Sequence, residues 1–163
     1  MLYALFLLKQ LTTKTIIMIP IVLNKLRITS VVLLIIIALN ALAAGYSFMV
    51  EPSGEDLGIT TDLLRYSPFE NYRIPGLLLF IANGLLSLAT TFIVLSKHKL
   101  YPYAIIFQGS VLFGWIIIQL SLLQFMHLLH VICGIIGLIL IIMGSVILNE
   151  QARDLSGENC LAE

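Results

Sequence analysis

The stretch that decides the fold is Leu100–Asn149, LYPYAIIFQGSVLFGWIIIQLSLLQFMHLLHVICGIIGLILIIMGSVILN. It contains no Lys, Arg, Asp or Glu. A membrane-spanning helix needs about 20 apolar residues, so this stretch is too long for one span and has to turn within itself. Its polar residues are densest between Gln124 and His130. We therefore predict two spans separated by a tight turn near Gln124–His127.

Two further uncharged stretches precede this one. An ionised side chain at the bilayer centre costs roughly 2.5–3.5 kcal/mol, so such stretches are typical of membrane insertion. A helix satisfies its own backbone in lipid, whereas a β-barrel needs alternating polar residues, which the run Val31–Leu39 lacks. The sequence predicts an all-α integral membrane four-helix bundle over residues 28–148. The expected spans are about 28–50, 74–96, 102–123 and 128–148.

The composition agrees with this class. Of 163 residues, 60% are hydrophobic and 11% charged, the mean hydropathy is +1.04 and the formal net charge is +0. Typical soluble domains are roughly 45–50% apolar and 25% charged. These values exclude a disordered chain, a soluble enzyme of ordinary composition and a nucleic-acid binder with a basic face. The expected surroundings are a lipid bilayer.

The basic residues predict the orientation, because cytoplasmic segments carry an excess of Lys and Arg. Two of them, Arg65 and Arg73, fall in the connection between the first two spans. The other seven fall on the opposite side: Lys9, Lys14, Lys25, Arg27, Lys97, Lys99 and Arg153. We therefore expect a multi-pass protein of the cell (inner) membrane, with both termini and the acidic tail 149–163 in the cytoplasm and the loop Glu51–Arg73 outside.

Residues 1–27 form an apolar but poorly patterned segment, which Pro20 is expected to interrupt. One interpretation is an interfacial helix on the cytoplasmic leaflet. The other is that translation starts at Met18. The two cysteines, Cys133 and Cys160, are expected at different membrane levels, so we predict no disulfide between them.

Polar residues inside the spans define a candidate site. Gln108, Trp115 and Gln119 fall within about 40° on one face of the third span. Amides on such a face either hydrogen-bond neighbouring helices or line a cavity for lipid or quinone. The candidate pocket residues are Asn83, Gln108, Trp115, Gln119, His127 and His130.

The fourth span places its two histidines and three glycines on one face. The glycines Gly134, Gly137 and Gly144 predict close helix packing. His127 and His130 have no further ligands evident nearby, so we expect neither metal nor haem, and no cofactor at all. No span contains an ionisable Asp, Glu, Lys or Arg, so the usual relay of a proton-coupled transporter is missing.

The outer loop is long for a connection without a role. It reads Glu51-Pro52-Ser53-Gly54-Glu55-Asp56-Leu57-Gly58, later Ser67-Pro68-Phe69-Glu70-Asn71-Tyr72-Arg73-Ile74-Pro75-Gly76. Its turn residues and apolar side chains predict a structured lid over the bundle mouth. The pattern resembles an uncharacterised family of small bacterial four-span membrane proteins, over about residues 28–148. The motif residues are Pro52, Gly54, Gly58, Pro68, Phe69, Tyr72, Pro75 and Gly76.

The resemblance implies a fold and no chemistry. Asp62, Glu70, Tyr72 and Arg73 are the loop's only reactive candidates, and nothing in the sequence sets their geometry, so we expect no catalytic residues. The leading hypothesis is a non-enzymatic structural or accessory membrane component that acts by contacts with a protein partner. One alternative is a lipid- or quinone-binding protein with a pocket beneath the outer loop. Another is a subunit of an oligomeric transporter or channel, because four spans alone rarely enclose a polar pore.

Overall fold

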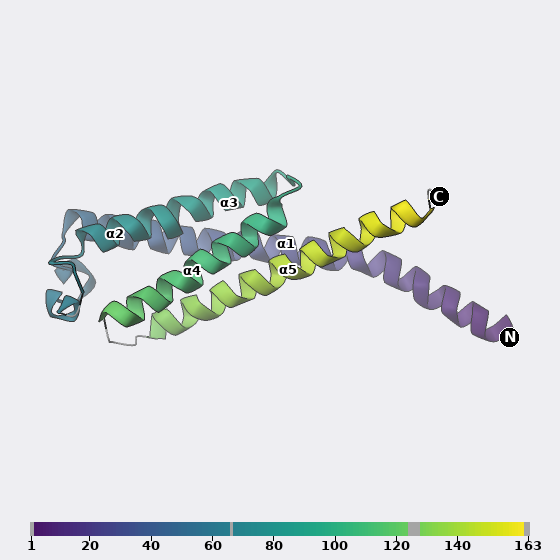
Figure 1. Cartoon of the computed structure of the whole chain (residues 1–163), viewed down its shortest axis with the longest axis horizontal. Helices are drawn as coiled ribbons and strands as arrows, with labels where there is room; N and C mark the ends of the chain where they lie inside the picture. Colours follow the sequence, from purple (N-terminus) through teal and green to yellow (C-terminus); the bar gives the residue numbers. More distant parts are fainter. Residues whose placement is uncertain (1, 66, 124–127, 162–163) are drawn as a thin grey trace.

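A computed structural model of the chain describes the backbone of residues 2–65, 67–123 and 128–161 and the side chains of residues 18–65, 67–121 and 128–153. The predicted all-α four-helix bundle is confirmed (Figure 1). The described residues contain four helical segments long and apolar enough to cross a membrane, and no strand. These segments are Met18–Val50, Arg73–Leu95, Tyr101–Ser121 and Leu128–Arg153.

The first helix, α1 (Leu2–Val50), is continuous over 49 residues. The interruption expected at Pro20 is wrong, because Pro20 lies inside the helix. A proline removes one backbone hydrogen bond, a loss that apolar helices tolerate. The N-terminal part of α1 extends well beyond the other spans (Figure 1). The interfacial helix and the start at Met18 both stay predictions.

The second span consists of three consecutive helical pieces. These are α2 (Arg73–Leu79), the π-helical turn η3 (Phe80–Leu85) and α3 (Leu86–Leu95). The span packs along α1 at glycines. A Cβ on Gly45 would lie 2.8 Å from the carbonyl oxygen of Gly76, and a Cβ on Gly84 would lie 2.6 Å from the Leu42 side chain.

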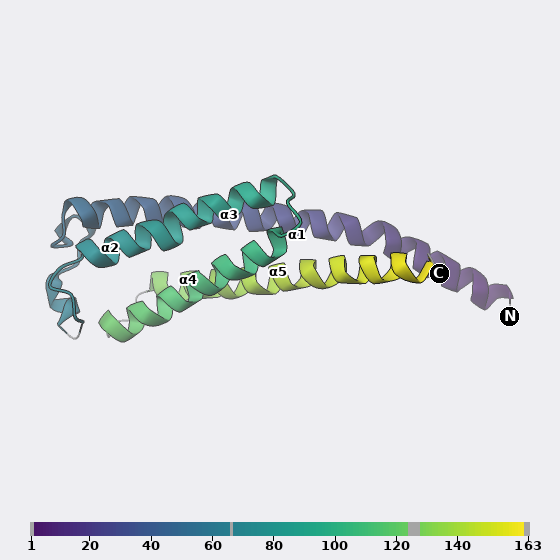
Figure 2. The same cartoon turned by 45° about the horizontal axis from the view of Figure 1, so that its top comes forward.

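The third and fourth spans form a second close pair, α4 (Tyr101–Leu123) and α5 (Leu128–Leu161). A Cβ on Gly109 would lie 2.8 Å from the Gly137 carbonyl oxygen, and one on Gly144 would lie 3.0 Å from that of Pro102. Close packing at Gly137 and Gly144 is therefore confirmed, whereas Gly134 makes only an ordinary contact at 3.8 Å. The turned view shows the two pairs stacked as two layers (Figure 2).

The third and fourth spans end and begin on either side of the predicted turn. α4 ends at Leu123 and α5 begins at Leu128, and the predicted turn residues Gln124–His127 lie outside the described residues. At the other end, α5 continues through the acidic tail to Leu161.

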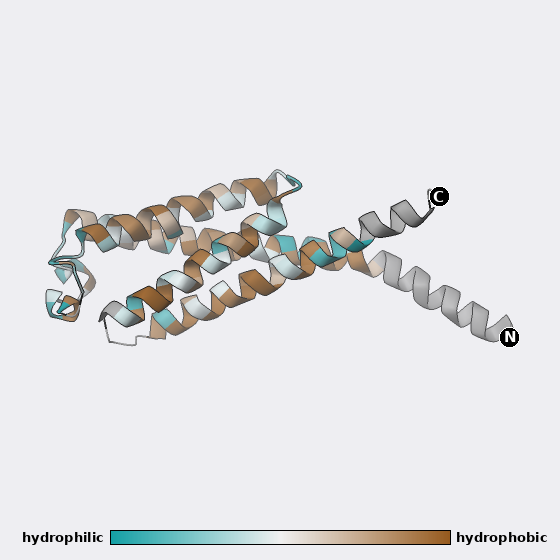
Figure 3. Cartoon of the chain, in the orientation of Figure 1, coloured by the Kyte–Doolittle hydropathy of each residue, from teal (hydrophilic) through white to brown (hydrophobic). Residues whose placement is uncertain are grey.

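A hydrophobic cluster in the core draws on all four spans: Leu34, Ile37, Val94, Ile105, Leu112, Leu140 and Ile147. Hydrophobic residues run along all four spans (Figure 3), and many large ones are exposed. Phe92 is 72% exposed and Ile142 62% exposed. Large exposed apolar surface of this kind is unusual for a protein in water and suits contact with lipid.

Candidate functional site: the outer loop and the buried polar residues

The outer loop is organised around Tyr72. Its backbone N–H donates a hydrogen bond to the carbonyl oxygen of Pro52 at 2.9 Å, and its hydroxyl donates to that of Thr60 at 2.9 Å. Its ring stacks on Phe48 of α1, with centroids 5.0 Å apart. Tyr72 is only 3% exposed. One residue, through its backbone and its side chain, therefore connects the start, middle and end of the loop to the bundle.

The first half of the loop is a series of tight turns. The N–H of Gly54 donates to the carbonyl oxygen of Glu51, and the short helix η1 (Glu55–Leu57) follows. Gly54 has a φ of 84° and Gly58 a φ of 69°, a region that L side chains rarely adopt. A Cβ on Gly54 would also lie 2.7 Å from the Ile59 side chain. Both motif glycines are therefore required by the backbone path.

The second half contains the short helix η2 (Thr61–Leu64), whose Leu64 is buried near α4. After it, the Ser67 hydroxyl accepts a hydrogen bond from the N–H of Phe69, next to Pro68. Pro75 lies in the first turn of α2, where a missing N–H costs little. A Cβ on Gly76 would collide with the Phe48 side chain. The expected structured loop is thus observed, and it lies at one end of the bundle (Figure 1).

The loop carries five acidic and two basic residues. Four carboxylates are exposed and form no ion pair with another described residue: Glu55, Asp56, Asp62 and Glu70. The fifth, Glu51, accepts hydrogen bonds from Ser53, which lower its pKa. Burial raises the pKa of Tyr72, so its phenol stays neutral. The exposed face of a tightly folded loop is therefore acidic.

Two of the candidate pocket residues meet inside the bundle. Gln108 is fully buried, and its amide nitrogen donates to the carbonyl oxygen of Ala82 at 3.2 Å. Asn83, the next residue of the π-helical turn, is also fully buried. Both polar atoms of the Asn83 amide and the Oε1 atom of Gln108 have no hydrogen-bond partner among the described residues. These amides thus lie where α4 contacts the second span.

The other pocket candidates do not join this pair in one cavity. Trp115 and Gln119 are half-buried further along α4, and the indole N–H of Trp115 has no partner among the described residues. His130 is half-buried and lines a groove of about 270 Å³ between α4 and α5 that none of the other candidates lines. His127 lies outside the described residues.

Three features were missed by the sequence analysis. The first is the π-helical turn that carries Asn83. The second is Ser87, which is fully buried one turn later and whose hydroxyl has no hydrogen-bond partner among the described residues. The third is an apolar groove at the α3–α4 turn. For the π-helical turn and Ser87, the sequence offers two signals: the absence of charge in the second span and the four-residue spacing of Asn83 and Ser87.

Within the part of the chain that the structure describes, no group of three or more His, Cys, Asp or Glu side chains lies close enough together to hold a metal ion. Cys133 is a free thiol.

The fold and these sites define a class: an all-α, four-span membrane protein with a folded loop at one end. No protein-family model, curated protein or solved structure matches the chain. The resemblance to small bacterial four-span proteins therefore stays a prediction, carried by the loop motif and by the Gly114-Trp115-Ile116 and Gln119 run of the third span.

Proposed function

We propose that the chain is a non-enzymatic accessory component of the bacterial cell (inner) membrane that acts by binding a protein partner through its outer loop. One observation carries the proposal: Tyr72 fixes the loop in one shape while four carboxylates remain exposed. A loop that is already ordered loses little conformational entropy on binding. Its charge favours a partner segment rich in Lys or Arg.

The proposed orientation puts this loop outside and both termini in the cytoplasm, in line with the distribution of basic residues. Thr61 and Ser96 are exposed at opposite ends of the bundle. With both native cysteines replaced by alanine, we expect a membrane-impermeant maleimide to label Thr61→Cys in intact cells. Ser96→Cys should react only after lysis. Labelling of Ser96→Cys in intact cells would reverse the orientation.

Binding is tested by photo-crosslinking in native membranes. A photoreactive amino acid replaces Leu57, which is 44% exposed beside Asp56. We expect a discrete protein adduct that is lost when Glu55→Lys and Asp56→Lys are combined. The matched control, Glu150→Lys in α5, should retain it. Adducts with lipid alone, or an adduct insensitive to charge reversal in the loop, would overturn the proposal.

A second candidate function is binding of a small polar ligand or quinone head group inside the bundle. The observation that favours it is the set of buried polar atoms on Asn83, Ser87 and Gln108 that lack described partners. Native mass spectrometry and an absorbance spectrum of the purified protein test it. A stoichiometric ligand that Asn83→Leu removes would support this function, and an empty, colourless protein would count against it.

A further inference from the structure

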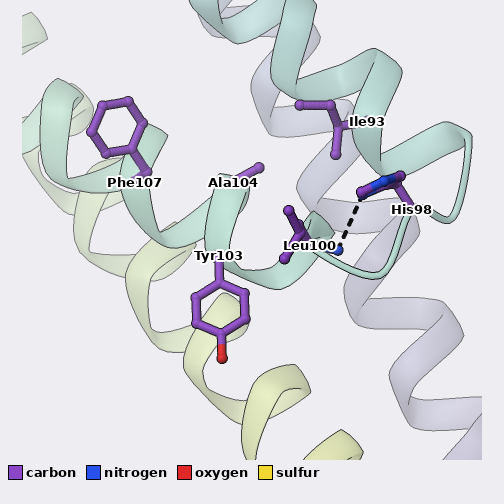
Figure 4. A pocket seen from close by; sticks show the side chains of 6 residues that line it. All are labelled: Ile93, His98, Leu100, Tyr103, Ala104 and Phe107. Carbon is purple, nitrogen blue, oxygen red and sulfur yellow. Dashed lines mark hydrogen bonds between the residues drawn. The ribbon is translucent and has the colours of Figure 1, made fainter.

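An apolar groove lies at the α3–α4 turn, at the other end of the bundle from the outer loop (Figure 1). Its volume is about 450 Å³ and its lining is almost entirely apolar. Figure 4 shows the side chains that line it: Ile93, His98, Leu100, Tyr103, Ala104 and Phe107.

The groove is elongated along α4. Leu100, Ala104 and Phe107 are spaced four and three residues apart, so they follow one helix face. At 1.5 Å per residue, they extend about 10 Å from the turn into the span. Ile93 of α3 faces Leu100 and Ala104 from the other side (Figure 4). The groove therefore runs from the end of the helices towards the middle of the apolar region.

The turn at the mouth of this groove has a fixed conformation. Lys97 adopts a positive φ of 51°. Its N–H donates to the carbonyl oxygen of Val94 at 3.2 Å, and the N–H of His98 donates to that of Ile93 at 3.4 Å. These two bonds form the Schellman arrangement that ends many helices. The mouth is thus held in place by the backbone and does not depend on the lysine side chains.

The mouth is positively charged. Lys97 and Lys99 are exposed, and neither forms an ion pair with another described residue. The Nδ1 atom of His98 accepts the N–H of Leu100 at 3.3 Å, which places the ring proton on the other nitrogen, Nε2. His98 therefore offers an N–H donor at an exposed position beside two ammonium groups.

A further cation lies at the same end of the bundle. Arg27 of α1 is within electrostatic reach of Tyr101, the first residue of α4. An apolar groove that opens between cationic and N–H donor groups complements an amphipathic molecule with an apolar chain and an anionic head. A free anion has no apolar chain to bury in the groove, and a neutral lipid has no net charge for the lysines to attract.

We propose that this groove binds one acyl chain of an anionic phospholipid whose phosphate group contacts His98 Nε2, Lys97 and Lys99. Each basic residue near an anionic membrane surface raises the binding constant by about fivefold. The inference is independent of the proposed loop contacts, because the two surfaces lie at opposite ends of the bundle.

The test is native mass spectrometry of the full chain in detergent after lipid removal. Phosphatidylglycerol and phosphatidylcholine with identical acyl chains are added at equal concentrations. We expect one retained phosphatidylglycerol, with a preference over phosphatidylcholine of at least about tenfold. Lys97→Asn combined with Lys99→Gln should abolish the preference, since asparagine tolerates the positive φ of position 97. The control, Arg73→Gln at the other end, should keep it.

A second variant tests the groove itself. Ala104→Trp places an indole in the apolar groove and should reduce retention of both lipids. Helicity and resistance to denaturation confirm that each variant is folded. Equal retention of the two lipids by the unmodified protein would overturn the proposal. So would a preference that survives removal of both lysine charges, or retention that Ala104→Trp leaves unchanged in a folded variant.

Discussion

The side-chain amide of Gln108 donates a hydrogen bond to the backbone carbonyl oxygen of Ala82, joining α4 to the π-helical turn of the second span. A π-helical turn replaces the i→i+4 backbone pattern with i→i+5 bonds, and such turns are frequent at functional sites. Gln108 thus contributes a polar contact between the two helix pairs. Asn83 lies next to the accepting carbonyl and finds no described partner. Polar groups are therefore concentrated where the two layers meet.

The first prediction concerns Asn83. A buried amide without hydrogen bonds costs roughly 1–3 kcal/mol in desolvation. Leucine has a similar size and no polar atoms, so Asn83→Leu should raise the free energy of unfolding by about 1 kcal/mol. Unfolding by SDS in mixed micelles, followed by circular dichroism, measures the change. Loss of stability would show that the amide is hydrogen-bonded in the native protein, and would favour the ligand-binding function.

The second prediction concerns the approach of α4 to α5. A Cβ on Gly109 would lie 2.8 Å from the Gly137 carbonyl oxygen, which is backbone and cannot move aside cheaply. Gly109→Ala should therefore destabilise the protein by about 2 kcal/mol, as overpacking does. The same unfolding experiment measures this change.

Gly114 provides the matched control on the same helix. A Cβ there would meet nothing within 4 Å. Because alanine is a better helix former than glycine, Gly114→Ala should be neutral or stabilise by up to about 1 kcal/mol. Similar destabilisation by both variants would contradict the packing of α4 against α5.

The spans could be predicted because their signal is local. The absence of charge between Leu100 and Asn149 is a direct consequence of membrane insertion, and α4 and α5 fall within that stretch up to the tail. The π-helical turn could not be predicted in the same way. The turn packs against α1 and α4, and the residues from Phe80 to Leu85 fit an ordinary helix equally well.

The polar face of α4 shows a second limit of sequence reasoning. Helical spacing predicts Gln108, Trp115 and Gln119 on one side of the helix, but it does not predict which neighbour each of them meets. Gln108 hydrogen-bonds to the second span and is fully buried there, whereas Trp115 and Gln119 are half-buried. The loop shows the same limit, because Tyr72 bonds residues 12 and 20 positions earlier. Those hydrogen bonds depend on the path of the chain, which the identities of the motif residues alone do not determine.

The third prediction compares the two loop glycines. Both have a positive φ, so alanine is strained at either position by about 1–2 kcal/mol. At Gly54 a Cβ would also lie 2.7 Å from the Ile59 side chain and 3.1 Å from the Tyr72 ring, whereas at Gly58 it would meet nothing within 4 Å. Gly54→Ala should therefore loosen the loop more than Gly58→Ala. Hydrogen exchange of the loop amides measures both effects, and the reverse order would contradict the packing of Gly54 under Tyr72.

The fourth prediction isolates the Tyr72 hydroxyl. Tyr72→Phe keeps the ring stacked on Phe48 but removes the hydrogen bond to the Thr60 carbonyl oxygen. A loss of about 1 kcal/mol should speed tryptic cleavage after the exposed Arg65 roughly fivefold, if cleavage follows local opening. Equal cleavage rates in the two proteins would contradict a structural role for the hydroxyl.

The same hydroxyl sets the pH dependence of the loop. Burial raises the pKa of Tyr72 above its ordinary value of 10.0, so the folded loop favours the neutral phenol. The stabilisation is complete below pH 10.0 and is lost as the pH rises through the raised pKa of the folded state. The difference in tyrosinate absorbance between the unmodified protein and Tyr72→Phe reports the titration of this residue alone. We expect its midpoint above 10.0, the ordinary pKa of a tyrosine. A midpoint at or below 10.0 would show that the ring is accessible to water, and the loop would then lack the fixed shape on which the proposed partner binding depends.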